Sequence, residues 1–192
     1  MQSIDTSTLR MGNTLPRENY LVISAIGEDR PGIVNELAKA CSDYQCNIVD
    51  SRMTVLGAEF ALVMMVSGSW DAIAKLENII PPLARKLDLN LIIKQTQARR
   101  PARALTYNVN VVALDHPGIV YRIAQFFYSR KINIDELQTN TYSAPHSGTQ
   151  MFNINMTVNI PADMHLASLR EEFMLFCDDL NLDAVLEPMR SI

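Results

Sequence analysis

Apolar residues recur along this chain at two spacings, and these spacings predict strands and helices in a regular order. Residues 20–26 are rich in branched and aromatic side chains, which favours a strand. Residues 48–56 and 59–67 predict two more strands, joined at Gly57 and Ala58 by a tight hairpin. Between the first strand and this pair, apolar side chains recur every three or four residues, as on one face of a helix: Ile33, Leu37, Cys41 and Tyr44.

A second helix is predicted after the hairpin. Its apolar side chains are again three or four residues apart: Ile73, Leu76, Ile80, Leu83 and Leu87. Pro81 and Pro82 lie inside this stretch, and a proline in a helix interior removes a backbone hydrogen bond and clashes with the preceding turn. We therefore expect the two prolines to interrupt the helix. Residues 89–94 predict a short closing strand.

The whole pattern returns in the second half of the chain. Residues 29–33 (DRPGI) recur as residues 115–119 (DHPGI), and Asn47, at the start of a predicted strand, recurs as Asn133. The apolar face of the last helix recurs as well: Leu166, Leu169, Phe173, Phe176 and Leu180. Repeated blocks in the same order indicate a tandem duplication, and the second copy carries extra residues within 142–148.

The order β-α-β-β-α-β, found twice, predicts an α+β protein with two tandem ferredoxin-like domains. Each domain would have a four-stranded antiparallel sheet with both helices on one face. The predicted boundaries are a flexible tail over residues 1–18, a first domain over 19–95, a linker over 96–104 and a second domain over 105–192. Residues 60–66 are apolar on both faces of their strand, so we expect the neighbouring copy to cover the second face.

Composition narrows the possible functions. A net charge of −4 over 192 residues is poorly suited to a general hold on nucleic acid, which requires a dense Lys/Arg surface. The three cysteines include no C-x-x-C pair and the histidines are not clustered, so we expect neither a disulfide framework nor a metal site. No apolar run is long enough to cross a membrane and the first residues lack an apolar signal core, so we expect a cytoplasmic protein without membrane association.

The repeated D-x-P-G turn is the first candidate for chemistry, and it has two interpretations. The aspartate could cap a helix that starts at the proline, with the glycine only permitting a tight turn. Alternatively, free N–H groups at the helix start, beside a glycine, could receive a ligand's carboxylate while the aspartate holds its amino group. Asn47 and Asn133 leave a similar choice open, because asparagine suits helix ends and its amide also suits the paired groups of an amino acid.

Motifs of the common enzyme classes are missing from the chain. There is no P-loop, no G-x-S-x-G, no H-E-x-x-H and no G-x-G-x-x-G after a strand. No basic second helix follows a short glycine turn, as a helix-turn-helix would require. We therefore expect no catalytic residues and no cofactor, and a protein that is not an enzyme.

These residues resemble the ACT domain family of amino-acid-sensing modules. The resemblance rests on D-R-P-G-I-V and C-N-I-V-D-S-R in the first copy, and on D-H-P-G-I-V and I-N-I-D-E-L in the second. In ACT domains, ligands bind where two domains meet, at the loop after the first strand and at the asparagine that opens the second strand. The resemblance therefore implies two sets of ligand-binding residues: Asp29, Arg30, Pro31, Gly32, Ile33 and Asn47, and Asp115, His116, Pro117, Gly118, Ile119 and Asn133.

One contact of some ACT sites is absent from this chain. Those sites have a histidine two residues before the position of the aspartate, where this chain has Gly27 and Ala113. The absence puts a serine-type site in doubt.

Two such domains with little else resemble the glycine cleavage system transcriptional repressors of bacteria. That resemblance implies a small amino acid as ligand, with glycine as the first candidate. It also implies a transcription factor of the LysR type as protein partner, in place of direct contact with DNA. Symmetric pairing into a homodimer fits such a protein. Two alternatives stay open: an ACT-fold interaction module without a small ligand, and a regulatory subunit of an amino-acid or one-carbon metabolic enzyme.

Overall fold

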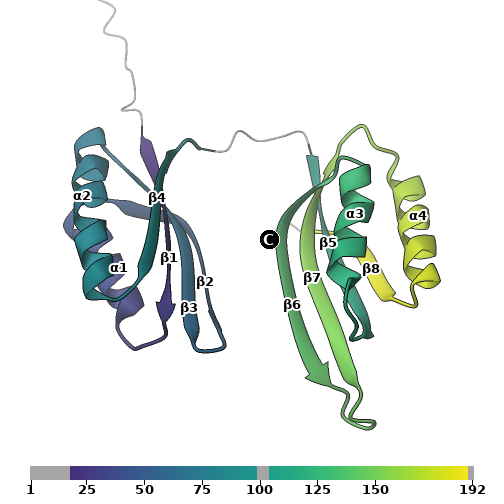
Figure 1. Ribbon diagram of the computed structural model, residues 1–192. Coiled ribbons are helices and arrows are strands. Elements are labelled where there is room, and N and C mark those ends of the chain that lie inside the picture. The colour runs from purple at the N-terminus through teal and green to yellow at the C-terminus, as the bar shows by residue number, and fades with distance from the viewer. Residues whose placement is uncertain (1–17, 99–103, 190–192) are drawn as a thin grey trace, which may run out of the picture. The chain divides into compact units, whose positions relative to one another are not determined.

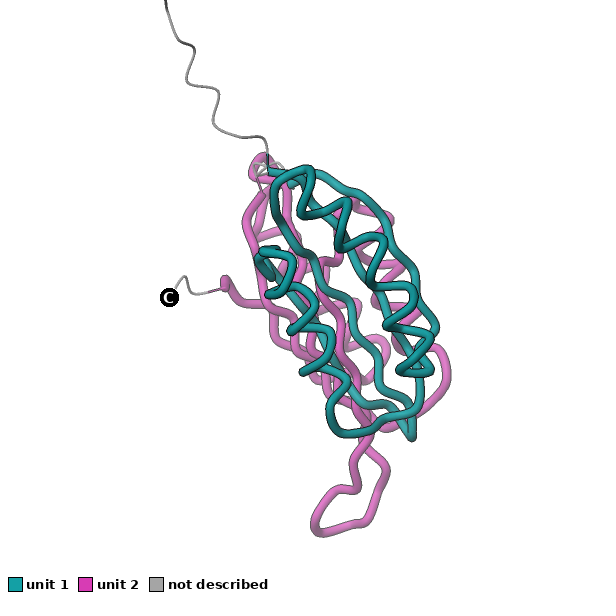
Figure 2. The backbone as a smooth tube through the Cα atoms, turned by 90° about the vertical axis from the view of Figure 1, so that its left-hand side faces the viewer, with its two compact units in different colours: residues 1–100 teal, residues 101–192 magenta. Residues whose placement is uncertain are grey.

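The computed structural model describes residues 18–98 and 104–189. The chain forms two compact units, residues 1–100 and 101–192, which have different colours in Figure 2. The predicted tail, apart from Glu18, and the central part of the predicted linker lie outside the described residues. Each unit has its own sheet and its own hydrophobic core.

Both units have the predicted order of elements, as Figure 1 shows. The first unit comprises β1 (Asn19–Glu28), α1 (Ile33–Asp43), β2 (Asn47–Leu56), β3 (Glu59–Gly68), α2 (Trp70–Lys86) and β4 (Asn90–Thr96). The second comprises β5 (Ala104–Leu114), α3 (Ile119–Ser129), β6 (Asn133–Ser143), β7 (Gln150–Pro161), α4 (Leu166–Asp179) and β8 (Asp183–Pro188).

The two sheets have the same topology. Their strand orders are β2-β3-β1-β4 and β6-β7-β5-β8, and every pairing is antiparallel. Both helices of each unit lie on one face of its sheet (Figure 1). The predicted α+β class and the two tandem ferredoxin-like domains are therefore confirmed.

Each core forms between the helices and one face of the sheet. In β1, Leu21 and Ile23 are fully buried, and they pack with Leu37 of α1 and Leu76 of α2. Successive side chains of a strand point to opposite faces, so the alternate residues of β1 are left on the face without helices. The second core is built in the same way and contains fully buried Ile123 of α3.

Aromatic rings hold the two helices of the second unit together. Phe127 of α3 and Phe173 of α4 are fully buried, with ring centroids 5.3 Å apart. Phe126 lies 5.2 Å from Phe173 by the same measure. At the surface end of this cluster, the Arg130 guanidinium lies 3.7 Å from the Phe126 ring centroid and its Nη2 is 2.8 Å from a carboxylate oxygen of Glu172. The second unit thus has a strongly aromatic core between α3 and α4.

The expected interruption at Pro81 and Pro82 is wrong. α2 runs without a break from Trp70 to Lys86 and contains both prolines. Its apolar face is buried on both sides of them: Ala72, Ile73, Leu76, Ile80 and Ala84. Burial of this face stabilises the helix enough to offset the backbone hydrogen bonds that the prolines cannot make.

All three cysteines are free and buried. Burial raises the pKa of the Cys41 thiol to about 11, and the neighbouring Cys46 adds to the effect. Burial likewise raises the pKa of Cys177 to about 12, with a further contribution from the Asp178 carboxylate. The pKa of Cys46 is also raised by burial. Because the thiolate is the reactive form, these cysteines are poor nucleophiles in the folded chain.

We expect the folded protein to react slowly with thiol-specific disulfide reagents near neutral pH. A thiol pKa raised by two units lowers the thiolate fraction by about 100-fold, and burial slows access further. Cys46, with 7% of its surface exposed against 1% for Cys41, should react first. The release of coloured thiolate from the reagent measures the rates, and the chain unfolded in guanidinium is the control. Rapid reaction of all three thiols in the folded state would contradict the burial described.

Candidate functional site

The two D-x-P-G turns have the same backbone geometry. Gly32 precedes α1 with φ 101° and ψ −15°, and Gly118 precedes α3 with φ 99° and ψ −6°. This left-handed conformation suits glycine and is strained for residues with a side chain. Apart from the glycine and its chain neighbours, no atom lies within 4 Å of where a Cβ would stand on either glycine, so the space beside each glycine is open.

The capping interpretation required each helix to begin at its proline, and the structure contradicts this. α1 begins at Ile33 and α3 at Ile119, so Pro31 and Pro117 lie in the turns before them. The glycine stands at the N-cap position of each helix, and no side chain makes a capping hydrogen bond there. Asp29 and Asp115 therefore do not cap these helices. The amide groups of each first helical turn remain available to an acceptor from outside the helix.

The backbone of each aspartate is held by the neighbouring hairpin. The N–H of Asp29 donates to the carbonyl oxygen of Ala58 at 2.9 Å, and the N–H of Asp115 donates to that of Gln150 at 3.1 Å. Both aspartates are exposed. These bonds fix where each side chain starts, beside the open helix terminus.

The first turn packs against the segment between α2 and β4. Arg30 Nη2 is 3.5 Å from the carbonyl oxygen of Lys86, at the C-terminal end of α2, where a positive charge is favourable. A Cβ on Gly27 would stand 2.6 Å from the carbonyl oxygen of Asp88, which is closer than real contacts allow. A side chain at this position would displace that segment. The absent histidine at residue 27 thus has a steric explanation.

The second turn borders a hollow of about 470 Å³ between the start of α3 and the end of α4. His116, Pro117, Gly118 and Ile119 line it, together with residues of α3, the end of α4 and the segment that follows α4: Tyr121, Arg122, Asp179, Leu180, Asn181 and Leu182. His116 Nδ1 lies 3.1 Å from the carbonyl oxygen of Pro117. The volume is ample for a small amino acid, and Arg122 brings a positive charge to its wall.

Asn47 and Asn133, the two asparagines of the repeat, lie far from these turns within each unit. Asn47 pairs with Ser67, which pairs with Tyr20 near the start of β1, whereas Asp29 follows the end of β1. The eight steps along the strand from Tyr20 to Glu28, at about 3.3 Å each, separate the two ends by about 26 Å. The second unit repeats this arrangement, with Asn133 opposite Asn159. The predicted site residues therefore form two groups at opposite ends of each sheet.

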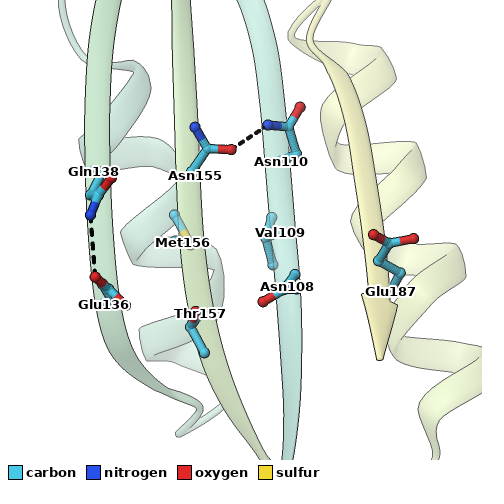
Figure 3. A pocket seen from close by; sticks show the side chains of 9 residues that line it. All are labelled: Asn108, Val109, Asn110, Glu136, Gln138, Asn155, Met156, Thr157 and Glu187. Atoms are coloured by element: carbon cyan, nitrogen blue, oxygen red, sulfur yellow. Dashed lines mark hydrogen bonds between the residues drawn. The ribbon is translucent and has the colours of Figure 1, made fainter. Parts of the chain in front are cut away.

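The structure has a further polar surface that the sequence analysis did not predict. The face of the second sheet without helices carries a hollow of about 520 Å³, shown in Figure 3. Asn110 Nδ2 donates to Asn155 Oδ1 at 2.6 Å and is 3.2 Å from Asn153 Oδ1, while Gln138 donates to Glu136 at 3.2 Å. Asparagine is depleted in strands, so its repeated use on one face was the available signal. The alternation of polar and apolar residues over 153–158 indicates only that this face of the sheet is open to solvent.

Two classes of site are not found among residues 18–98 and 104–189. No group of three or more His, Cys, Asp or Glu side chains there could hold a metal ion. None of the described helices has the length and apolar character needed to cross a membrane.

Comparison with known proteins agrees with this architecture. The ACT domain family model matches residues 19–94, which lie within the first unit. A glycine cleavage system transcriptional repressor of Escherichia coli (strain K12) is 38% identical over 169 residues, covering 88% of this chain and 89% of the relative. The corresponding protein of Shigella flexneri has the same identity and coverage.

Solved structures give the same result. A crystal structure assigned to a glycine cleavage system transcriptional repressor has a TM-score of 0.69 at 33% identity, covering 91% of this chain and 99% of that chain. A protein of unknown function from Galdieria sulphuraria shares the fold, with a TM-score of 0.73 at 24% identity, covering 91% and 100%. The chain belongs to the ACT-domain family of glycine cleavage system transcriptional repressors.

Proposed function

We propose that this protein is a non-enzymatic regulator that binds a small amino acid, with glycine as the first candidate. It would control transcription of glycine cleavage genes through a protein partner. The observation that carries the proposal is the 38% identity to the Escherichia coli repressor, which extends over 88% of this chain. The partner would be a transcription factor of the LysR type. Direct DNA binding is not expected, because a net charge of −4 opposes binding to the phosphate backbone.

The ligand would bind at the D-x-P-G turns. The first amides of α1 and α3, which no side chain caps, would donate to the ligand's carboxylate. Asp29 or Asp115 would accept from its ammonium group. Gly32 and Gly118 leave space where a side chain would stand, which suits close approach of a small ligand.

The asparagines would take part only from another domain or another chain. About 26 Å of strand separates Asn47 from Asp29 inside the first unit, which is several times the length of an amino acid. One ligand cannot contact both groups of residues within a single unit. We therefore assign the turn residues the primary role and Asn47 and Asn133 a role in completing the site from outside the unit.

A thermal-shift titration with amino acids tests the ligand. A ligand that binds only the folded state adds about 2.7 kcal/mol at 100 times its Kd, which raises Tm by about 10 °C or more for a domain of 60–100 residues. Glycine should raise Tm, and leucine, with its bulky side chain, should not. The Asp29→Asn/Asp115→Asn variant should keep the Tm of the free protein and lose the glycine response. If no amino acid shifts Tm at millimolar concentration, the ligand is not of this class.

An interaction module without a small ligand is the second candidate. The apolar side chains on the open face of the first sheet favour it, because exposed apolar patches mark protein contacts: Ile26, Val63 and Ile92 are 47%, 49% and 71% exposed. The two candidates differ in one result. A ligand-free module would hold its protein partner equally well with and without glycine, and equally well in the Asp29→Asn/Asp115→Asn variant.

A further inference from the structure

The two D-x-P-G turns have the same backbone geometry but different side chains around them. In the first unit, the side chain of Arg30 reaches from the turn to the end of α2, where its Nη2 lies 3.5 Å from the carbonyl oxygen of Lys86. His116 stands in the place of Arg30 in the second turn. Its Nδ1 lies 3.1 Å from the carbonyl oxygen of the next residue, Pro117. The contact of His116 therefore stays within its turn, whereas that of Arg30 connects the turn to a second helix.

The second unit has a hollow in the corresponding place. Its volume is about 470 Å³, and it lies between the start of α3 and the end of α4. The ends of α2 and α4 are equivalent, because Lys86 and Asp179 are their last residues. The residue that follows the C-cap has φ 55° at Asp88 and 54° at Asn181. The hollow of the second unit thus lies where the Arg30 side chain passes in the first.

Two residues on the wall of the hollow carry opposite charges. Arg122 belongs to the opening helical turn of α3, and Asp179 ends α4. Both side chains are exposed, and within residues 18–98 and 104–189 neither is hydrogen-bonded or ion-paired to another side chain. A free amino acid carries one carboxylate and one ammonium group. The pair of charges on this wall matches the pair on such a ligand.

The matching residues of the first unit have the reverse charges. Glu36 stands in the opening helical turn of α1, where α3 has Arg122. Lys86 ends α2, where α4 has Asp179. A carboxylate that approaches the start of α1 is repelled by Glu36, whereas one that approaches the start of α3 is attracted by Arg122. Of the two turns, the second alone combines a hollow with charges of the right sign.

We propose that the second D-x-P-G turn, together with the end of α4, is the principal ligand site and takes one zwitterionic amino acid. This inference rests on the proposed function, since it assigns the amino-acid ligand to one of the two turns. The Arg122 guanidinium donates to the ligand's carboxylate, and the Asp179 carboxylate accepts from its ammonium group, in addition to Asp115 of the turn. In the first unit, Arg30 and Glu36 lower the affinity of the equivalent turn.

A calorimetric titration of the full chain with glycine tests the assignment. The unmodified protein should bind a single glycine per chain with its higher affinity. Arg122→Glu and Asp179→Lys, which give the second unit the charges of the first, should each weaken this binding by about tenfold or more, because each replaces a charge-assisted contact with repulsion. Glu36→Gln, at the position that matches Arg122, is the control and should leave the affinity of the principal site unchanged.

A gain of binding tests the same assignment from the other side. The triple variant Arg30→His/Glu36→Arg/Lys86→Asp gives the first unit the side chains of the second at the three positions that differ in the argument. It should bind a second glycine per chain. All three side chains lie at the surface, and far-UV circular dichroism of each variant verifies that folding is retained.

The possible failures separate this inference from the proposed function. Glycine binding that neither Arg122→Glu nor Asp179→Lys weakens would overturn the inference, as would two sites of equal affinity in the unmodified chain. The proposed amino-acid ligand would stand in both cases. A triple variant that still binds a single glycine would overturn the roles of Arg30 and Glu36. If neither glycine nor any other small amino acid gives a heat of binding, both proposals are wrong.

Discussion

Phe173→Ala is expected to lower the free energy of unfolding of the second unit by about 3–5 kcal/mol. Phe173 is fully buried, and its ring centroid lies 5.2 Å from that of Phe126 and 5.3 Å from that of Phe127. Removing the ring deletes apolar contacts on both helices and leaves a cavity that Phe126 and Phe127 cannot close, because α3 and α4 are each fixed on the sheet. A loss of this size approaches the whole stability of a small domain.

Hydrogen exchange measured on peptides from each unit is the suitable readout. Amides of α3 and α4 should lose protection, while those of α1 and α2, which belong to a separate core, should keep it. Leu175→Ala is the matched control, because Leu175 lies in the same helix and is 60% exposed. It should change stability by less than about 0.5 kcal/mol. Equal loss of protection in both units would show that the two cores do not unfold independently.

The order and type of the elements were predictable because each leaves a local pattern. Runs of branched and aromatic residues predicted the strands, three-to-four spacing predicted the helices, and the duplication allowed each half to be tested against the other. Strand ends differed by one or two residues: β1 extends to Glu28 beyond the predicted residue 26. The ends of a strand depend on its pairing with neighbouring strands, and the local spacing of residues does not specify pairing between strands that are distant in the sequence.

The errors arose where packing overrides local preference. Pro81 and Pro82 lie within a continuous α2 because the face with Leu76 and Ile80 is fully buried against the sheet. The start of α1 was misplaced by the usual preference of proline for a first helical turn. Here Gly32 takes the N-cap position with a positive φ, and proline belongs to the turn.

The candidate site was predictable in its parts but not in its geometry. Sequence identified Asp29 and Asn47 as repeated features, and it could not show that β1 and β2 run in the same direction with α1 returning between them. That path places the end of β1 and the start of β2 at opposite ends of the sheet. The amide-lined face around Asn110 and Asn155 was missed for a related reason, since cross-strand neighbours appear only once the register is known.

Gly27→Ala is expected to destabilise the first unit by about 1–3 kcal/mol, although alanine is ordinarily the better residue in a strand. The added methyl group would stand 2.6 Å from the carbonyl oxygen of Asp88 and 2.9 Å from Leu89 Cδ2. Asp88 has little freedom to move away. Its φ is 55°, its N–H donates to the carbonyl of Arg85, and the next N–H donates to that of Ala84 at 2.8 Å.

The second unit supplies the matched control. Ala113 occupies the equivalent place in β5 and is buried with its methyl group accommodated, so Ala113→Gly should cost only about 0.5–1 kcal/mol from backbone freedom. Peptide-resolved hydrogen exchange should show lost protection in β1, β4 and the end of α2 for Gly27→Ala alone. If Gly27→Ala proves neutral, the contact with Asp88 is not a constraint, and the absence of a larger side chain beside the first D-x-P-G turn needs a functional cause. If it is destabilising, the fold itself excludes a side chain at residue 27, and the proposed contacts of the first turn are those of Asp29 and the amides of α1.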